Sequence, residues 1–209
     1  MSLALIDPSK YLFWITTRAA GTAALILASA AVGVGLAMAT GVLRRGGADR
    51  RVVHEVLSLS AIAAILVHVL SLLADSYLHA TVLDVTVPFV FSYKTLATSI
   101  GIVAGWGIVL LGLSYYVRRW IGQRRWRSLH RFTGLVWVLG LVHAFTEGSD
   151  AGQWWFIALI GTAAAPAVVL LAFRILQGRV ARPRPAPATE RARPQPSRPR
   201  DRAVAEQYG

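Results

Sequence analysis

Residues 52–74 (VVHEVLSLSAIAAILVHVLSLLA) and residues 129–146 (LHRFTGLVWVLGLVHAFT) decide the fold of this chain. Both are largely apolar runs of about the length that crosses a bilayer as one helix, and each contains two histidines. Histidine is costly in hydrocarbon, so a histidine inside such a run is a functional-site hypothesis by default. The two runs therefore predict a membrane-embedded helical fold and also the place where its chemistry lies.

The histidines are spaced so that each run places one of them near either face of the membrane. His54 and His68 are 14 residues apart, and His130 and His143 are 13 residues apart. At about 1.5 Å of rise per residue, each pair spans roughly 20 Å of a membrane about 30 Å thick. Two such helices running parallel would offer two stacked pairs of imidazoles, each able to hold one metal centre.

The rotation about the helix axis is less uniform than the spacing. At about 100° per residue, 14 residues end some 40° short of four full turns, so His54 and His68 share a face. Thirteen residues leave His130 and His143 roughly 140° apart on an ideal helix. The glycines of this second run can permit a distortion, or the two sites lie on different sides of the helix. The spacing leaves both interpretations open.

Composition points to one membrane domain. Of the 209 residues, 55% are hydrophobic and 15% charged, against about 25% charged in ordinary soluble proteins. Cysteine is absent, which excludes disulfides, thiolate metal sites, iron–sulfur clusters and covalently attached haem, and leaves histidine as the obvious strong ligand. The net charge of +12 comes from arginines in short loops and a tail, which indicates membrane topology and not nucleic-acid binding.

The hydropathy pattern predicts an all-α, polytopic membrane helix bundle with about five transmembrane helices. The predicted spans are residues 19–43, 52–74, 95–117, 129–146 and 154–176. We expect residues 1–18 to form an outer N-terminal segment, residues 19–177 the transmembrane bundle, and residues 178–209 a disordered basic tail that touches lipid headgroups. The stretch 80–93, which contains Pro88, is too short to span and is expected to form an outer-surface cap or a re-entrant segment.

Charge then sets the orientation. The first and third loops carry arginine clusters, Arg44, Arg45, Arg50, Arg51 and Arg118, Arg119, Arg124, Arg125, Arg127, whereas the other two loops carry Lys94 as their one basic residue. The positive-inside rule places the arginine loops and the tail in the cytoplasm and the N-terminus outside. The second and fourth spans therefore run parallel, with His54 and His130 at the inner level and His68 and His143 toward the outer one. Lysine is rare beside arginine, which we attribute to a GC-rich bacterial genome, and we expect the bacterial cytoplasmic membrane.

These residues carry a resemblance to a known family. The chain resembles the ferric-reductase-like transmembrane domain family, which includes ferric reductases, NADPH oxidases and the haem-binding membrane subunit of periplasmic methionine sulfoxide reductase. The likeness covers about residues 11–177 and rests on Arg18 in TRAAG, on His54 and His68, on His130 in RSLHR, and on His143. It implies two b-type haems, one per leaflet, with His54 paired to His130 and His68 paired to His143 as axial ligands. The 13-residue spacing of His130 and His143 also recurs in that family.

The chain departs from that family in one respect. The family's oxidases and reductases feed electrons from an attached flavin and nicotinamide domain. Here there is no G-x-G-x-x-G motif after a strand, no phosphate loop, and no room for such a domain after Gln177. We therefore expect the electron-transfer component of an oxidoreductase, served by a separate donor: a flavoprotein, a quinol or a diffusible flavin.

Three further residues allow two interpretations each. Arg18 suits a haem propionate or an acceptor beside the outer site, or it is an arginine that snorkels to the outer interface. His79 is an interface histidine or an additional ligand. Trp137 fills space in the bundle or lies between the two haems.

Two functions are consistent with these features. The first is an integral-membrane cytochrome b that moves electrons to the outer face, toward ferric complexes, oxygen or a periplasmic redox acceptor. The alternative is a non-haem small transporter or assembly protein whose histidines and Arg18 serve ion or proton movement. The lack of an internal repeat and of several intramembrane carboxylates weighs against the alternative.

Overall fold

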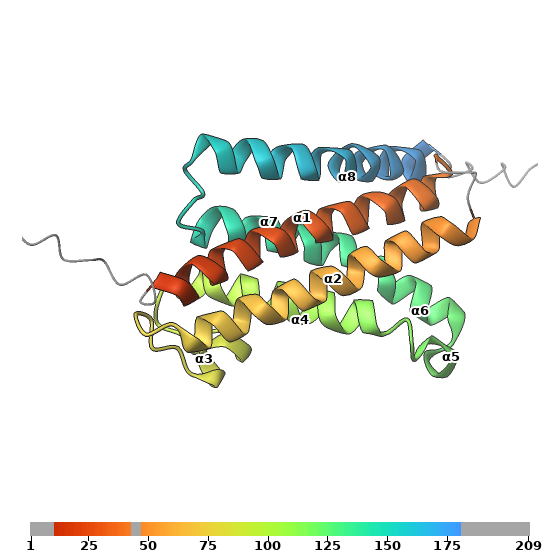
Figure 1. Cartoon of the computed structure of the whole chain (residues 1–209). Helices are drawn as coiled ribbons and strands as arrows, with labels where there is room; N and C mark the ends of the chain where they lie inside the picture. The colour runs from red at the N-terminus through yellow and green to blue at the C-terminus, as the bar shows by residue number, and fades with distance from the viewer. Residues whose placement is uncertain (1–10, 43–46, 181–209) are drawn as a thin grey trace, which may run out of the picture. The chain divides into compact units, whose positions relative to one another are not determined.

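The computed structural model describes residues 11–42 and 47–180, and these form helices without any strand (Figure 1). The helices are α1 (Leu12–Thr40), α2 (Gly47–Ala74), α3 (Val82–Thr86), α4 (Thr95–Leu113), α5 (Arg118–Ile121), α6 (Gln123–His130), α7 (Thr133–Glu147) and α8 (Trp154–Val180). The chain divides into a compact unit that ends at Ile175 and a second unit from Leu176 onward. Of the predicted tail, residues 178–180 close α8 and residues 181–209 lie outside the described residues.

Four of the described helices are long and apolar enough to cross a membrane. They are α1, α2, α4 and α8, with spans at Leu12–Thr40, Ala48–Ala74, Thr95–Leu113 and Trp154–Gln177. A single apolar helix hides its own backbone polar groups, so such helices are what a bilayer tolerates. For the described residues, the prediction of an all-helical fold is confirmed, with four helices suited to span a membrane where five were predicted.

The fourth predicted span, residues 129–146, is divided into two helices. Helix α6 ends at His130 and α7 begins at Thr133, so the two predicted site residues of this run lie on different helices. Between them the Phe132 amide donates to the Leu129 carbonyl at 2.9 Å, which is the tighter i→i+3 bond of a 3₁₀ turn. With 15 residues, α7 alone is shorter than the roughly 20 that span a bilayer.

Two helices begin earlier than their hydropathy predicts. Helix α1 starts at Leu12 and not near residue 19, so Arg18, expected at the entrance of the first span, lies inside it, and the predicted outer segment 1–18 contains the first turns of α1. Apolar side chains from Leu12 to Ile15 continue the hydrophobic pattern and explain the extension. Helix α2 starts at Gly47, inside the predicted basic loop, with Asp49 in its positively polarised first turn.

The helices pack as two pairs. Helix α1 lies along α2 and α4 lies along α7, while contacts between α1 and α7 and between α2 and α4 join the pairs (Figure 1). Backbone packing between α2 and α7 is slight at most. Alanines of α1, α2 and α8 surround Trp137, which is 1% exposed and donates from Nε1 to Ser29 Oγ at 3.0 Å. Small residues permit this close approach, and Trp137 is a core residue of the bundle.

The segment before α4 contains one short helix, α3, and does not span, as its length predicts. Helix α3 opens with a capping box, in which the Thr81 hydroxyl accepts from the Asp84 amide and the Asp84 carboxylate accepts from the Thr81 amide. The Thr81 hydroxyl also donates to the Asp84 carboxylate at 2.6 Å, and this bond, followed by that from the Thr81 amide, lowers the pKa of Asp84. The Trp106 indole of α4 donates to the Thr86 carbonyl at 2.9 Å and ties this segment to the bundle.

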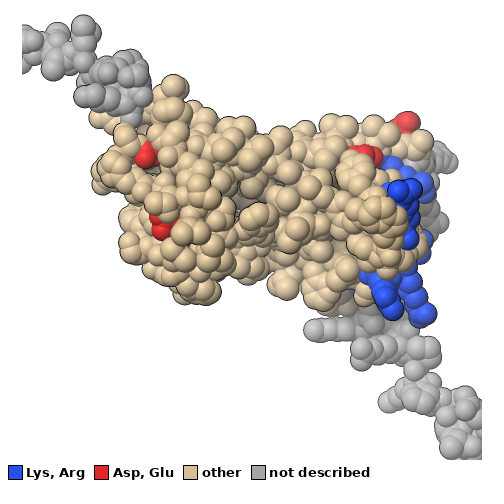
Figure 2. All heavy atoms as spheres, turned by 90° about the horizontal axis from the view of Figure 1, so that it is seen from below, with Lys and Arg blue, Asp and Glu red and all other residues tan. Residues whose placement is uncertain are grey.

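Charge is distributed unequally along the helices. Figure 2 shows the Lys and Arg side chains of the visible face gathered at one end, the end that carries α5 and α6. Those two helices hold Arg118, Arg119, Arg124, Arg125 and Arg127. This end is therefore the basic end of the bundle, and the turn between α7 and α8, with Asp150, belongs to the opposite end.

Candidate functional site

The four predicted histidines meet in two groups, one near each end of the bundle. The rings of His54 on α2 and His130 at the end of α6 have centroids 6.2 Å apart and planes at 88°. At the other level, His68 on α2 lies within electrostatic reach of His143 on α7. All four side chains are half-buried. Since His54 lies beside His130, and His68 lies close enough to His143 for their charges to interact, α2 and the α6–α7 segment run in the same direction.

The separation of the first pair is suited to a metal between two imidazoles. With metal–nitrogen bonds of about 2 Å, two imidazoles on opposite sides of one metal have ring centroids roughly 6 Å apart. The value of 6.2 Å between His54 and His130 meets this requirement. Because the backbones of α2 and α7 pack against each other only slightly, the two segments approach each other through side chains such as these rings.

Three of the four imidazoles are held by the same kind of hydrogen bond. In each, Nδ1 lies 2.8–3.0 Å from a backbone carbonyl of a neighbouring helix. The pairs are His54 with Ala31, His68 with Thr17, and His143 with Ala97. A carbonyl only accepts, so Nδ1 carries the proton and Nε2 keeps a lone pair for a metal. Histidines that bind metals are almost always oriented in this way.

Each of these carbonyls belongs to the residue four positions before a glycine. The glycines are Gly35 for His54, Gly21 for His68 and Gly101 for His143. A Cβ added at these positions would lie 3.1 Å from His54 Cε1, 2.9 Å from His68 Nδ1 and 2.5 Å from His143 Nδ1. Any side chain larger than the hydrogen of glycine would occupy the space of the ring. The imidazoles therefore need glycine at these positions in order to reach the carbonyls.

The fourth histidine is held differently. Among the described residues, no group forms a hydrogen bond with the buried Nδ1 of His130. The indole of Trp126, one turn earlier on α6, stacks on its ring with centroids 5.1 Å apart and planes at 21°. This site is therefore built from one hydrogen-bonded imidazole and one stacked imidazole.

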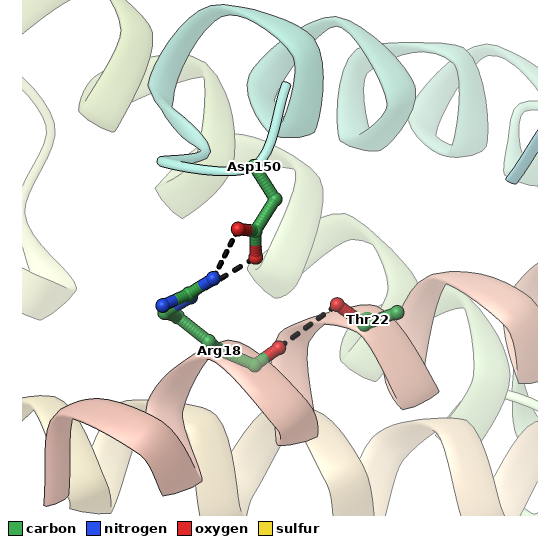
Figure 3. Close-up of polar contacts among 3 residues, drawn as sticks. All are labelled: Arg18, Thr22 and Asp150. Atoms are coloured by element: carbon green, nitrogen blue, oxygen red, sulfur yellow. Dashed lines mark hydrogen bonds and ion pairs between the residues drawn. The ribbon is translucent and has the colours of Figure 1, made fainter. Parts of the chain in front are cut away.

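Arg18 forms an ion pair with Asp150, a partner that sequence reasoning missed (Figure 3). Its Nε donates to Oδ2 at 3.0 Å and its Nη2 donates to Oδ1, and the guanidinium lies 4.2 Å from the centroid of the Trp14 ring. The Arg18 side chain is 32% exposed and that of Asp150 12% exposed. Arg18 follows Thr17, whose carbonyl holds His68, so the pair adjoins the second histidine level. An arginine inside an apolar helix was the available signal that a carboxylate partner exists.

His79 takes no part in this arrangement. It is exposed, lies in the turn region after α2, and has a left-handed backbone with φ of 47°. The interpretation as an interface residue agrees with its position. Across the described residues, no three or more His, Cys, Asp or Glu side chains converge on one point.

Comparisons with family models, curated proteins and solved structures find no match for this chain. The case for its function therefore rests on the residues and geometry described above.

Proposed function

We propose that the chain is an integral-membrane b-type cytochrome that carries electrons across the membrane between two bis-histidine haems. The observation that carries the proposal is the meeting of His54 and His130 at 6.2 Å between ring centroids. The Nδ1 hydrogen bonds of His54, His68 and His143 support it, because they present Nε2 as the free ligand atom. The family resemblance of the sequence leads to the same assignment.

The number of ligands favours haem over a bare metal ion. A protein-bound zinc or iron ion takes three or four side-chain ligands. Each level here offers two imidazoles among the described residues. A porphyrin brings four nitrogens of its own and needs only axial ligands, as two facing imidazoles provide. The absence of cysteine agrees with haem b that is not covalently attached.

The chain's residues have a limited but definite task. The haem supplies the change between ferric and ferrous iron, and its potential depends on ligands, hydrogen bonds and burial. His54 and His130 would hold it at one level, and His68 and His143 at the other. The carbonyls of Thr17, Ala31 and Ala97 orient three of these rings, and the apolar helices exclude water.

We propose the direction of transfer from the orientation that the charges favour. Through the positive-inside rule, the arginines of α5 and α6 support an orientation with the His54 and His130 level next to the cytoplasm, in a bacterial cytoplasmic membrane. Electrons would then enter from a separate flavoprotein, quinol or flavin. They would leave beside His68 and His143, toward a ferric complex, oxygen or a periplasmic redox protein.

One experiment separates this function from the non-haem alternative. The protein is expressed with ample haem, purified in detergent and examined by absorption spectroscopy before and after dithionite, together with haem quantitation. We expect a Soret band that shifts on reduction and about two haems per chain. Colourless protein would contradict the cytochrome and favour a transporter or assembly protein.

A further inference from the structure

His130 is the one imidazole of the quartet whose ring is not anchored through Nδ1 among the described residues. The Leu111 carbonyl of α4 lies within reach of the His130 ring, but no described group forms a hydrogen bond of normal geometry with His130 Nδ1. The same carbonyl accepts a hydrogen bond from Ser114 Oγ at 2.6 Å. The acceptor that corresponds to those of the other three histidines is therefore shared with a serine and does not by itself fix the His130 ring.

The same serine anchors the residue that replaces the missing bond. The Trp126 indole donates from Nε1 to Ser114 Oγ at 3.1 Å. Its ring plane lies 21° from that of His130, with 5.1 Å between centroids, so the two rings are stacked. Tyr115 also contacts Trp126, edge to face, at 5.9 Å between centroids. The indole is thus held at its nitrogen and at its edge, in contact with the imidazole.

We propose that Trp126 is the positioning residue of His130 and that Ser114 directs it there, so that the inner axial ligand is oriented by stacking and not by a hydrogen bond to the backbone. This inference rests on the proposed haem-binding function. Its consequence is that the two haem sites are unequal: the outer ligands are oriented by helix backbone, whereas one inner ligand depends on a side chain.

The arrangement also connects the inner ligand to the basic surface. Arg118 lies 3.7 Å over the Tyr115 ring and donates to the Tyr115 carbonyl at 2.7 Å. Arg118 and Tyr116 in turn line a surface cavity of about 280 Å³ together with Arg119 and Gln123. A contact at this cavity would reach the inner ligand through Tyr115 and Trp126 alone.

The test replaces Trp126 with leucine and with phenylalanine in the full chain. Trp120→Leu is the matched control, because Trp120 is 77% exposed at the same end of the bundle. Two measurements are made on haem-loaded protein: the rate of haem transfer to excess haem-free myoglobin, and the low-spin electron paramagnetic resonance signals of the oxidised state. The second reports the orientation of the axial imidazoles and does not depend on activity.

We expect Trp126→Leu to release one haem about tenfold faster, the range typical for loss of a group that orients a metal ligand. The resonance signal of that haem should move, and it should be the haem that His130→Ala removes. Phenylalanine keeps an aromatic ring for stacking and should restore most of the wild-type signal. Trp120→Leu should match the wild type in both measurements.

Two results would overturn the inference while leaving the cytochrome intact. One is wild-type release and unchanged signals in Trp126→Leu; the other is a change confined to the haem that His68→Ala removes. If Trp126→Leu does not yield folded protein, Ser114→Ala takes its place, because it frees the Leu111 carbonyl and the indole together. Unchanged signals in Ser114→Ala then overturn the inference. Protein that binds no haem would refute the proposed function and this inference together.

Discussion

The two histidine levels differ in what holds their rings. At the His68 and His143 level, both imidazoles bond through Nδ1 to backbone carbonyls at 2.8 Å, and each ring lies against a glycine. At the other level, His54 repeats this pattern, but His130 is stacked on Trp126. Both levels thus present two imidazoles, and they differ in how firmly the helix backbone determines ring orientation.

This difference has a structural origin. His143 lies within α7 and faces α4, where the turn that ends at Gly101 exposes a carbonyl to the ring. His130 is the last residue of α6, before the 3₁₀ turn that leads into α7. A helix end lies where neighbouring helices also end, so side chains, and not a continuous backbone surface, surround it. Equal ligands can therefore have unequal supports.

Loss of a haem-binding histidine should have the largest effect on the difference between the two levels. We expect His68→Ala and His143→Ala each to remove the outer haem and to leave inner haem in place. The reason is that alanine has no atom that can replace the imidazole as an axial ligand. His54→Ala should do the reverse. Haem quantitation and reduced-minus-oxidised spectra measure the result. His79→Ala is the control, since His79 is exposed and lies in the turn region after α2. Unchanged haem content in both outer variants would refute the pairing.

A methyl group at a glycine tests the outer support directly. In Gly101→Ala the new Cβ would lie 2.5 Å from His143 Nδ1, so the ring must move and lose its carbonyl. We expect outer haem affinity to fall about 10- to 100-fold. Gly161→Ala is the matched control, because its Cβ would meet no described atom within 4 Å outside its own helix.

The outcome of that pair of variants is measured by haem titration of the purified proteins. Both substitutions place alanine in a helix, where it is favoured over glycine by roughly 0.5–1 kcal/mol. A loss of affinity in Gly101→Ala alone therefore reports the contact with His143. Equal affinities in the two variants would show that the glycine does not govern the ring.

The smallest effect concerns the ion pair at the outer end. Asp150→Asn leaves the Arg18 guanidinium with a neutral partner, which should lower the free energy of unfolding by about 1–3 kcal/mol, less than for a fully buried pair because Arg18 is partly exposed. Arg18→Gln should cost a similar amount. Thermal unfolding in detergent gives both values and that of the double variant.

The double variant decides whether the two residues act together. If Arg18 and Asp150 interact as the structure shows, the double variant should lose less than the sum of the single losses. Strictly additive losses would indicate two independent contributions. Arg119→Gln, at the basic end and stacked at the surface over Trp120, should leave stability unchanged and serves as the control.

Much of the helical architecture could be predicted from hydropathy, because an apolar run of about 20 residues has few alternatives to a membrane helix. The spans of α2, α4 and α8 agree with their predicted ranges within several residues. The division at His130 could not be predicted, because Arg131 and Phe132 are compatible with a continuous helix. The assumption of a continuous helix also produced the calculated 140° between His130 and His143, and a 3₁₀ turn advances about 20° more per residue than an α-helix.

The sequence by itself determined a histidine-bearing bundle of apolar helices and the matched spacing of its two histidine pairs. These properties follow from local composition and from the rise per residue, which are the same in any packing. Only the tertiary structure decided which carbonyl orients each ring, which glycines make room for it, that Asp150 pairs with Arg18, and that Trp126 stacks on His130. Those contacts join helices far apart in the chain, and their ångström-scale fit depends on how side chains interlock when the helices pack.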